Sequence, residues 1–293
     1  METSSGFQKA AISLLCLSAV VIVLAGTLML IGEAAALQQA GSSAESPESA
    51  SLLLVQNTGQ RKAPPGRRAG PVQIKGFLER TYKDADGNEA KYVLFVPYSY
   101  SNKAKKLYPL ILFLHGSGQT GTDGRKQATG GLGLIVKNSE INFPFFVLFP
   151  QAQNRTWRAD SEDSKRAMDI LAEVEKEYKI DSKRIYLTGL SMGGFGTWSL
   201  AIAHPDKWAA IVPICGRGDT SKAEVIKDLP CWCFHGSDDH TVPVEGSREM
   251  IAAITKAGGK PKYTEYPGVG HNSWDRAYGT PELFRWLLSQ HRK

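Results

Sequence analysis

Three polar segments, each directly after an apolar run, contain residue types suited to nucleophilic chemistry. In the first, GLSMGG, Gly189, Ser191 and Gly193 form a G-x-S-x-G pattern between the run RIYLTG and a helical stretch. A serine on a tight strand-to-helix turn has a strained backbone and an exposed hydroxyl, and small neighbours relieve its clashes. This context predicts that Ser191 is a nucleophile. The alternative is a glycine-rich turn without chemistry, because the five-residue pattern alone is common.

A nucleophilic serine needs a general base to activate its hydroxyl and a carboxylate to orient that base. On this type of turn the acid and the histidine follow the serine along the chain, in that order. The segment WCFHGSDDHTVP offers Asp238 and Asp239, and the later segment YPGVGHNSW offers His271. Both segments follow extended runs, so the three groups are expected to meet at one edge of a sheet.

Acyl transfer also needs N–H donors for the oxyanion that develops on the substrate. Met192 follows the nucleophile and would supply one backbone N–H. Ser117, in HGSG after the run YPLILFLH, would supply the other. A plain glycine turn is the alternative for HGSG. Trp157 and Trp274 lie near these segments and could either bind substrate in an aromatic or sugar-binding cleft or serve as packing.

The rest of the pattern predicts the elements that hold these residues. Short apolar runs alternate with helical stretches, of which residues 161–178 show apolar residues at helical spacing. Continuous apolar runs between helices indicate a parallel sheet buried on both faces. Before them, VQIKGFLER and KYVLFVP flank the turn-forming DADGN, which predicts a hairpin. We therefore expect an α/β fold with a mostly parallel central sheet, flanking helices and an N-terminal antiparallel hairpin.

With these motifs in this order, residues 72–293 resemble the α/β-hydrolase superfamily. LHGSGQTG, GLSMGGFGTW, HPDKWAAIVPICG, FHGSDDHTVPV and GVGHNSW are similar to the branch of carboxylesterases, dienelactone hydrolases and polyhydroxybutyrate-depolymerase-like proteins that includes exported "predicted peptidases". The resemblance implies an α/β-hydrolase fold, and an acid at the second acidic position of HGDxDxxVP. That position is Asp239 here, with Asp238 as second choice. The first acidic position is Ser237, which removes a loop-bracing carboxylate.

These residues and the resemblance predict a serine hydrolase that cleaves carboxylic esters through an acyl-enzyme, with Ser191, Asp239 and His271 as its triad. The expected substrate is a small-molecule or polysaccharide ester. An exported serine peptidase of the same fold and a noncatalytic binding protein with a hydrolase fold are the alternatives. We expect no metal and no cofactor, because neither metal-ligand spacing nor a phosphate-binding loop is present in the sequence.

The N-terminal part of the chain predicts export. Residues 10–32 carry no charge, and about 20 apolar residues suffice to cross a bilayer, whereas the apolar core of a signal peptide is about 7 to 15 residues long. Length favours an uncleaved anchor, while the small residues 34–36 favour cleavage by a signal peptidase. Lys9 before the run favours a C-terminal part outside the cytoplasm, so that any contact with a membrane would be through residues 10–32.

We accordingly divide the chain into three parts and expect the last to be secreted, periplasmic or membrane-anchored. The parts are a signal peptide or signal anchor (1–36), a flexible Ser/Pro/Gly-rich linker (37–71) and an α/β-hydrolase catalytic domain (72–293).

Composition and charge exclude several other classes of protein. Of 293 residues, 42% are hydrophobic and 22% charged, which argues against a disordered, collagen-like or multispan membrane protein. The formal charge of +6 is spread without a dense basic run, so no nucleic-acid partner is expected. Cys215, Cys231 and Cys233 are expected to be buried free thiols.

Overall fold

The computed structural model describes residues 75–292 of the chain. The predicted signal segment (1–36) and linker (37–71) lie outside the described residues, as do the first three residues of the predicted domain. Among residues 75–292, none of the helices combines the length and apolar character needed to cross a bilayer.

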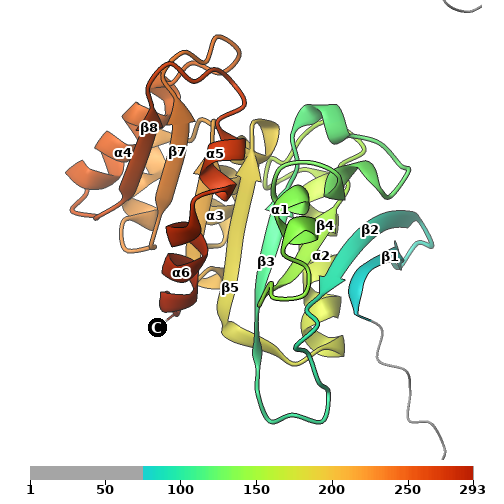
Figure 1. The fold of residues 1–293 in the computed structure, drawn as a ribbon. Helices are drawn as coiled ribbons and strands as arrows, with labels where there is room; N and C mark the ends of the chain where they lie inside the picture. The colour runs from blue at the N-terminus through green and yellow to red at the C-terminus, as the bar shows by residue number, and fades with distance from the viewer. Residues whose placement is uncertain (1–74, 293) are drawn as a thin grey trace, which may run out of the picture. The chain divides into compact units, whose positions relative to one another are not determined.

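The centre of the fold is an eight-stranded sheet with the strand order β1-β2-β4-β3-β5-β6-β7-β8 (Figure 1). Strand β2 pairs antiparallel with β1 and with β4, and every later neighbouring pair is parallel. The predicted mostly parallel sheet and its N-terminal hairpin are therefore confirmed. The strands are β1 (Gly76–Lys83), β2 (Glu89–Val96), β3 (Tyr108–Leu114), β4 (Phe146–Pro150), β5 (Ile180–Leu190), β6 (Ala210–Ile214), β7 (Trp232–Gly236) and β8 (Lys262–Tyr266).

Helices cover both faces of this sheet and explain why its central strands are continuous apolar runs. One apolar cluster joins the sheet to α2, α3 and α4, and the other joins it to α1, α5 and α6, which lie on the near face in Figure 1. Every residue of β3, β4, β6 and β7 is buried. The helices are α1 (Leu132–Asn138), α2 (Glu162–Glu177), α3 (Met192–Ala203), α4 (Glu245–Lys256), α5 (Trp274–Tyr278) and α6 (Pro281–Ser289), with short 3-10 helices η1 (Ser117–Gln119), η2 (Lys126–Ala128), η3 (Pro205–Lys207) and η4 (Thr220–Ile226).

Helix α2 forms where periodicity predicted a helix over residues 161–178. Ser161 caps its N-terminus, because the hydroxyl accepts a hydrogen bond from the Ser164 N–H at 3.3 Å. Four of the five apolar residues at helical spacing in this segment are buried in the helix, namely Ala167, Ile170, Leu171 and Val174. The fifth, Tyr178, is the half-buried C-cap just beyond its end. This helix packs on β4 and β5 and so supports the loop that follows β4.

The cysteine prediction is also confirmed for the three thiols in the described part of the chain. Cys215, Cys231 and Cys233 are free and buried. Cys231 pairs across the sheet with Ile211, whereas the Cys215 N–H bonds the Phe234 carbonyl at 2.9 Å. Cys215 and Cys231 therefore lie at opposite ends of their strands, out of disulfide reach.

Candidate active site

Ser191 occupies the sharp turn between β5 and α3. Its backbone is left-handed, with φ 54° and ψ −120°, a conformation that non-glycine residues rarely adopt and that often marks a functional site. The Ser191 N–H holds the turn by donating to the Ile214 carbonyl at 3.0 Å and to Cys215 Sγ at 3.3 Å. The turn leaves the Ser191 hydroxyl accessible at the carboxyl end of the sheet.

The glycines around Ser191 allow α3 to pack directly on the strands beneath it. A Cβ atom on Gly193 would overlap the carbonyl oxygen of Leu114 in β3, and one on Gly194 would overlap that of Ile214 in β6. Neither glycine has a positive φ, so the requirement is close approach and not backbone freedom. The G-x-S-x-G-G segment thus places both the hydroxyl and the start of α3.

His271 and Asp239 complete a hydrogen-bonded line with Ser191. His271, in the loop between β8 and α5, has its Nε2 2.9 Å from Ser191 Oγ and its Nδ1 2.7 Å from Asp239 Oδ2. Because an ionised carboxylate can only accept, Nδ1 donates to Asp239, and Nε2 is left to accept the Ser191 proton. The His271 side chain is 23% exposed, and the Asp239 side chain is fully buried.

Asp239 is held ionised despite its burial. Burial by itself raises the pKa of the carboxyl group, but hydrogen bonds from the Val242 N–H, from His271 and from the Thr241 N–H outweigh that effect and lower it. Both N–H groups donate to Oδ1 at 2.9 Å. Oδ2 therefore remains free to orient His271.

The adjacent Asp238 points elsewhere. It is exposed, and its Oδ1 accepts a hydrogen bond from Ser237 Oγ at 2.6 Å. Ser237 Oγ in turn accepts the Gly268 N–H at 2.9 Å. The hydroxyl that replaces the family's first acidic residue therefore still joins the β7 loop to the loop before His271.

The two residues predicted to supply N–H groups to the oxyanion also lie at the carboxyl end of the sheet, after β5 and β3. Met192 and Ser117 are the first residues of α3 and η1, and the first N–H groups of a helix have no partner within it. A Cβ on Gly116 would lie 3.7 Å from Ser191 Cβ, so the loop that carries Ser117 runs beside the nucleophile.

The predicted triad and the two predicted donors lie together in a fold with known relatives. A phospholipase/carboxylesterase family model matches residues 137–280. A solved thermostable esterase shares 40% identity and a TM-score of 0.69, over 74% of this chain and 63% of that one. The chain has the α/β-hydrolase fold, and its matches are to the carboxylesterase-like branch of that superfamily.

Two further relatives carry names that refer to polymeric substrates. A bifunctional acetylxylan esterase/xylanase from Neocallimastix patriciarum is 32% identical over 60% of this chain. A poly(3-hydroxyalkanoate) depolymerase C from Paucimonas lemoignei is 24% identical over 59% of it. The matches span only 27% and 51% of these relatives' own lengths.

Two buried histidines at the ends of β3 and β7, His115 and His235, brace the loops of the site. The His115 Nε2 accepts the Ala152 N–H at 2.9 Å, and its Nδ1 lies 2.7 Å from the Gly116 carbonyl. Burial lowers the pKa of His115 to about 4, so it remains neutral. His235 Nε2 lies 3.0 Å from the Val242 carbonyl and 3.3 Å from Asp239 Oδ2, which supports the acid from behind.

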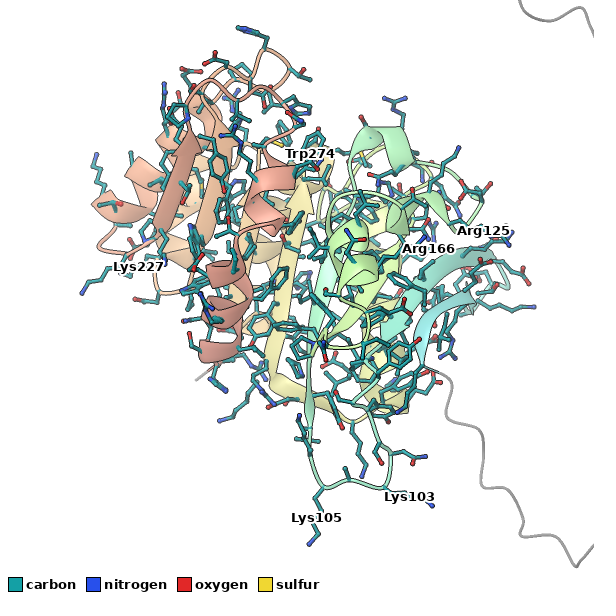
Figure 2. The ribbon with its side chains drawn as sticks, viewed as in Figure 1. Lys103, Lys105, Arg125, Arg166, Lys227 and Trp274 are labelled. Carbon is teal, nitrogen blue, oxygen red and sulfur yellow. The ribbon has the colours of Figure 1, made fainter. Side chains whose placement is uncertain are left out.

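The two tryptophans proposed for substrate binding lie in different environments. Trp157 is 2% exposed, and its indole N–H donates to the His115 carbonyl at 3.0 Å. Its ring is therefore mostly packed inside the protein, but Trp157 also lines the pocket beside Ser191, so its role in substrate binding stays a prediction. Trp274 is half-buried, and its ring lies edge-on to His271 with 5.2 Å between centroids. Figure 2 shows it at the carboxyl end of the sheet, where it can contact a substrate.

Cys215 and Arg155 are two residues of the site that sequence reasoning missed. Both have a positive φ, 40° and 53° respectively, and neither residue type signals this in a sequence. The Cys215 thiol lies under the triad, its Sγ within 4.8 Å of ligand atoms of Asp239 and His271. Burial raises the pKa of the Cys215 thiol to about 12, so Cys215 is a neutral thiol beneath Asp239 and His271.

A pocket of about 380 Å³ opens beside the nucleophile. Its walls come from the loop after β4 and from the first turns of α3, and include Arg155, Ser191, Phe195 and Ser199. An acyl or alcohol group of moderate size fits this volume.

Proposed function

We propose that the chain is a serine hydrolase that cleaves carboxylic esters through an acyl-enzyme. The observation that carries the proposal is the line from Ser191 Oγ through His271 to Asp239, with bonds of 2.9 and 2.7 Å. A strained serine at the start of a helix, next to a pocket, supports the same chemistry.

In the first half-reaction, Ser191 Oγ attacks the ester carbonyl carbon while its proton moves to His271 Nε2. The carbonyl π electrons move to oxygen, and the N–H groups of Ser117 and Met192 stabilise that oxyanion. When the intermediate collapses, the bond to the alcohol oxygen breaks, and His271 gives its proton to the departing alcohol. Ser191 is left acylated.

In the second half-reaction, water takes the place of the alcohol. His271 accepts a proton from the water as its oxygen attacks the acyl carbon, and then returns that proton to Ser191 Oγ as the acid leaves. Asp239 remains ionised in both halves and stabilises the imidazolium. The products are one carboxylic acid and one alcohol.

The proposal extends to location and substrate. Residues 72–293 would form the catalytic domain outside the cytoplasm, tethered by residues 37–71 to a signal peptide or anchor in residues 1–36. A polysaccharide ester or another small acyl ester is the proposed substrate, which agrees with the acetylxylan esterase named among the relatives. The half-buried Trp274 beside His271 would contact its sugar or aryl ring.

Ester and amide turnover separate this function from the peptidase alternative. We expect feruloyl, acetyl-xylan or hydroxyalkanoate esters to be hydrolysed, with kcat/KM at least roughly 10³-fold above that of the matching amides, because esters have the better leaving group. Comparable ester and amide turnover would favour a peptidase. No turnover of any ester by folded protein would favour the noncatalytic alternative.

A further inference from the structure

A groove runs from the nucleophile along one side of helix α3. The 380 Å³ pocket beside Ser191 adjoins a second hollow of about 550 Å³. Both are lined by Arg158, Phe195 and Ser199, so they form one depression, which we call the α3 groove. A substrate whose carbonyl reaches Ser191 can therefore extend into the second hollow.

The α3 groove contains an excess of positive charge. Its charged lining residues are Arg155, Arg158, Arg217, Lys222, Asp160 and Asp219. Asp160 is bound on both oxygens by Arg158, at 3.0 and 3.1 Å, and Asp219 accepts the N–H and hydroxyl of Ser221 at 3.0 and 2.7 Å. Within residues 75–292, the other three cations have no ion pair and no side-chain hydrogen bond.

Arg155 is fixed at the mouth of the groove by its loop. The two residues before it are anchored, because the N–H groups of Gln153 and Asn154 donate to the buried Asp163 carboxylate of α2 at 2.9 and 2.7 Å. The chain then enters the left-handed conformation at Arg155, with φ 53°. Such strain persists only where the surroundings impose it. The guanidinium is thus attached to an anchored backbone beside Ser191, exposed and without a carboxylate partner in the described part of the chain.

We propose that the α3 groove selects esters that carry a carboxylate, which binds Arg155 or, in a longer molecule, Arg217 and Lys222, while the ester carbonyl lies at Ser191. This inference rests on the proposed esterase function and specifies its substrate class. The planar guanidinium matches both oxygens of a carboxylate. Phe195, 40% exposed within the groove, offers an apolar surface to the carbon skeleton.

The carboxylate could belong to the acyl or to the alcohol part, and two pairs of esters distinguish the sources. Mono-p-nitrophenyl adipate and the p-nitrophenyl ester of adipamic acid differ only by a charge on the acyl side. Para-acetoxybenzoate and para-acetoxybenzamide differ in the same way on the alcohol side. In at least one pair we expect kcat/KM for the anionic ester to exceed that for the neutral ester by about five- to tenfold at low salt. The preference should shrink between ~0.02 M and ~0.5 M salt, because salt screens exposed charges.

Variants of the groove then show which residues cause the preference for anionic esters. Arg155→Gln, and separately the double change Arg217→Gln with Lys222→Gln, should lower the anionic-to-neutral ratio of kcat/KM toward one. Lys105→Gln is the matched control, because Lys105 is exposed at the opposite end of the sheet, as Figure 2 shows. The control should retain the wild-type ratio. Since each ratio is internal to one preparation, a loss of folded protein does not alter it.

A wild-type ratio near one in both pairs would overturn the inference while leaving the esterase function in place. An unchanged ratio in both groove variants would do the same. Failure of the folded wild-type protein to hydrolyse any of the four esters would contradict the esterase function itself, and the inference with it.

Discussion

Replacing Ser191 by alanine is expected to lower kcat on an activated ester by roughly 10⁴- to 10⁶-fold. Alanine keeps the backbone of the turn but lacks the oxygen that would form the acyl-enzyme. The loss of one partly buried hydrogen bond to His271 should change the free energy of unfolding by only about 1 kcal/mol. Steady-state kinetics and thermal unfolding of the same preparation measure both quantities.

Ser139→Ala provides the control for this variant. Ser139 is exposed at the C-terminal end of α1, where its hydroxyl bonds only the Ile135 carbonyl. Its replacement should leave kcat unchanged. Near-normal activity of Ser191→Ala would show that another residue forms the covalent bond.

The second large effect is expected from Asp239→Asn, which should lower kcat by about 10⁴-fold. The asparagine oxygen would retain the N–H groups of Thr241 and Val242, which leaves its NH₂ group facing His271 Nδ1. That donor favours the tautomer with the proton on Nε2, and Nε2 can then no longer accept the Ser191 proton. Steady-state kinetics of purified Asp239→Asn at neutral pH measures the loss.

Asp238→Asn is a closely matched control, because it makes the same chemical change one residue away. Asp238 is exposed and bonds Ser237, not His271, so its replacement should leave kcat within about twofold. Equal losses in the two variants would contradict the assignment of the acid.

The pH dependence of the wild-type rate follows from the same contacts. The pKa of Asp239 is lowered, so its carboxylate remains ionised as the pH falls through mild acid. The mechanism needs a lone pair on His271 Nε2 to accept the Ser191 proton and an ionised Asp239 to orient the ring, whereas Asp238 takes no part in either contact. The acid side of the kcat/KM profile is therefore expected to keep its shape in Asp238→Asn.

Much of this arrangement could be predicted because it depends on patterns that persist along the chain. Continuous apolar runs indicate strands buried on both faces, and these became β3, β4, β6 and β7. Parallel strands all end at one edge, so residues that follow them in sequence meet in space. That rule alone was enough to expect Ser191 and His271 to be neighbours.

Other features depend on how side chains point within a loop, and sequence pattern carries no such information. Asp238 and Asp239 are adjacent and chemically identical, and only the resemblance to a family favoured the residue that bonds His271. Trp157 lies in the predicted loop, yet its ring turns inward to His115. Arg155 and Cys215 adopt left-handed backbones that their residue types do not suggest. Each of these outcomes was decided by packing between distant segments.

The most direct test of the proposed mechanism is covalent labelling of the folded protein with a fluorophosphonate, followed by intact mass measurement and peptide mapping. We predict one adduct, located on Ser191, absent from Ser191→Ala and formed much more slowly in His271→Ala. The reagent mimics the tetrahedral intermediate and requires an activated serine. Folded wild-type protein that forms no adduct, or forms it on another residue, would contradict the assignment of Ser191 as nucleophile.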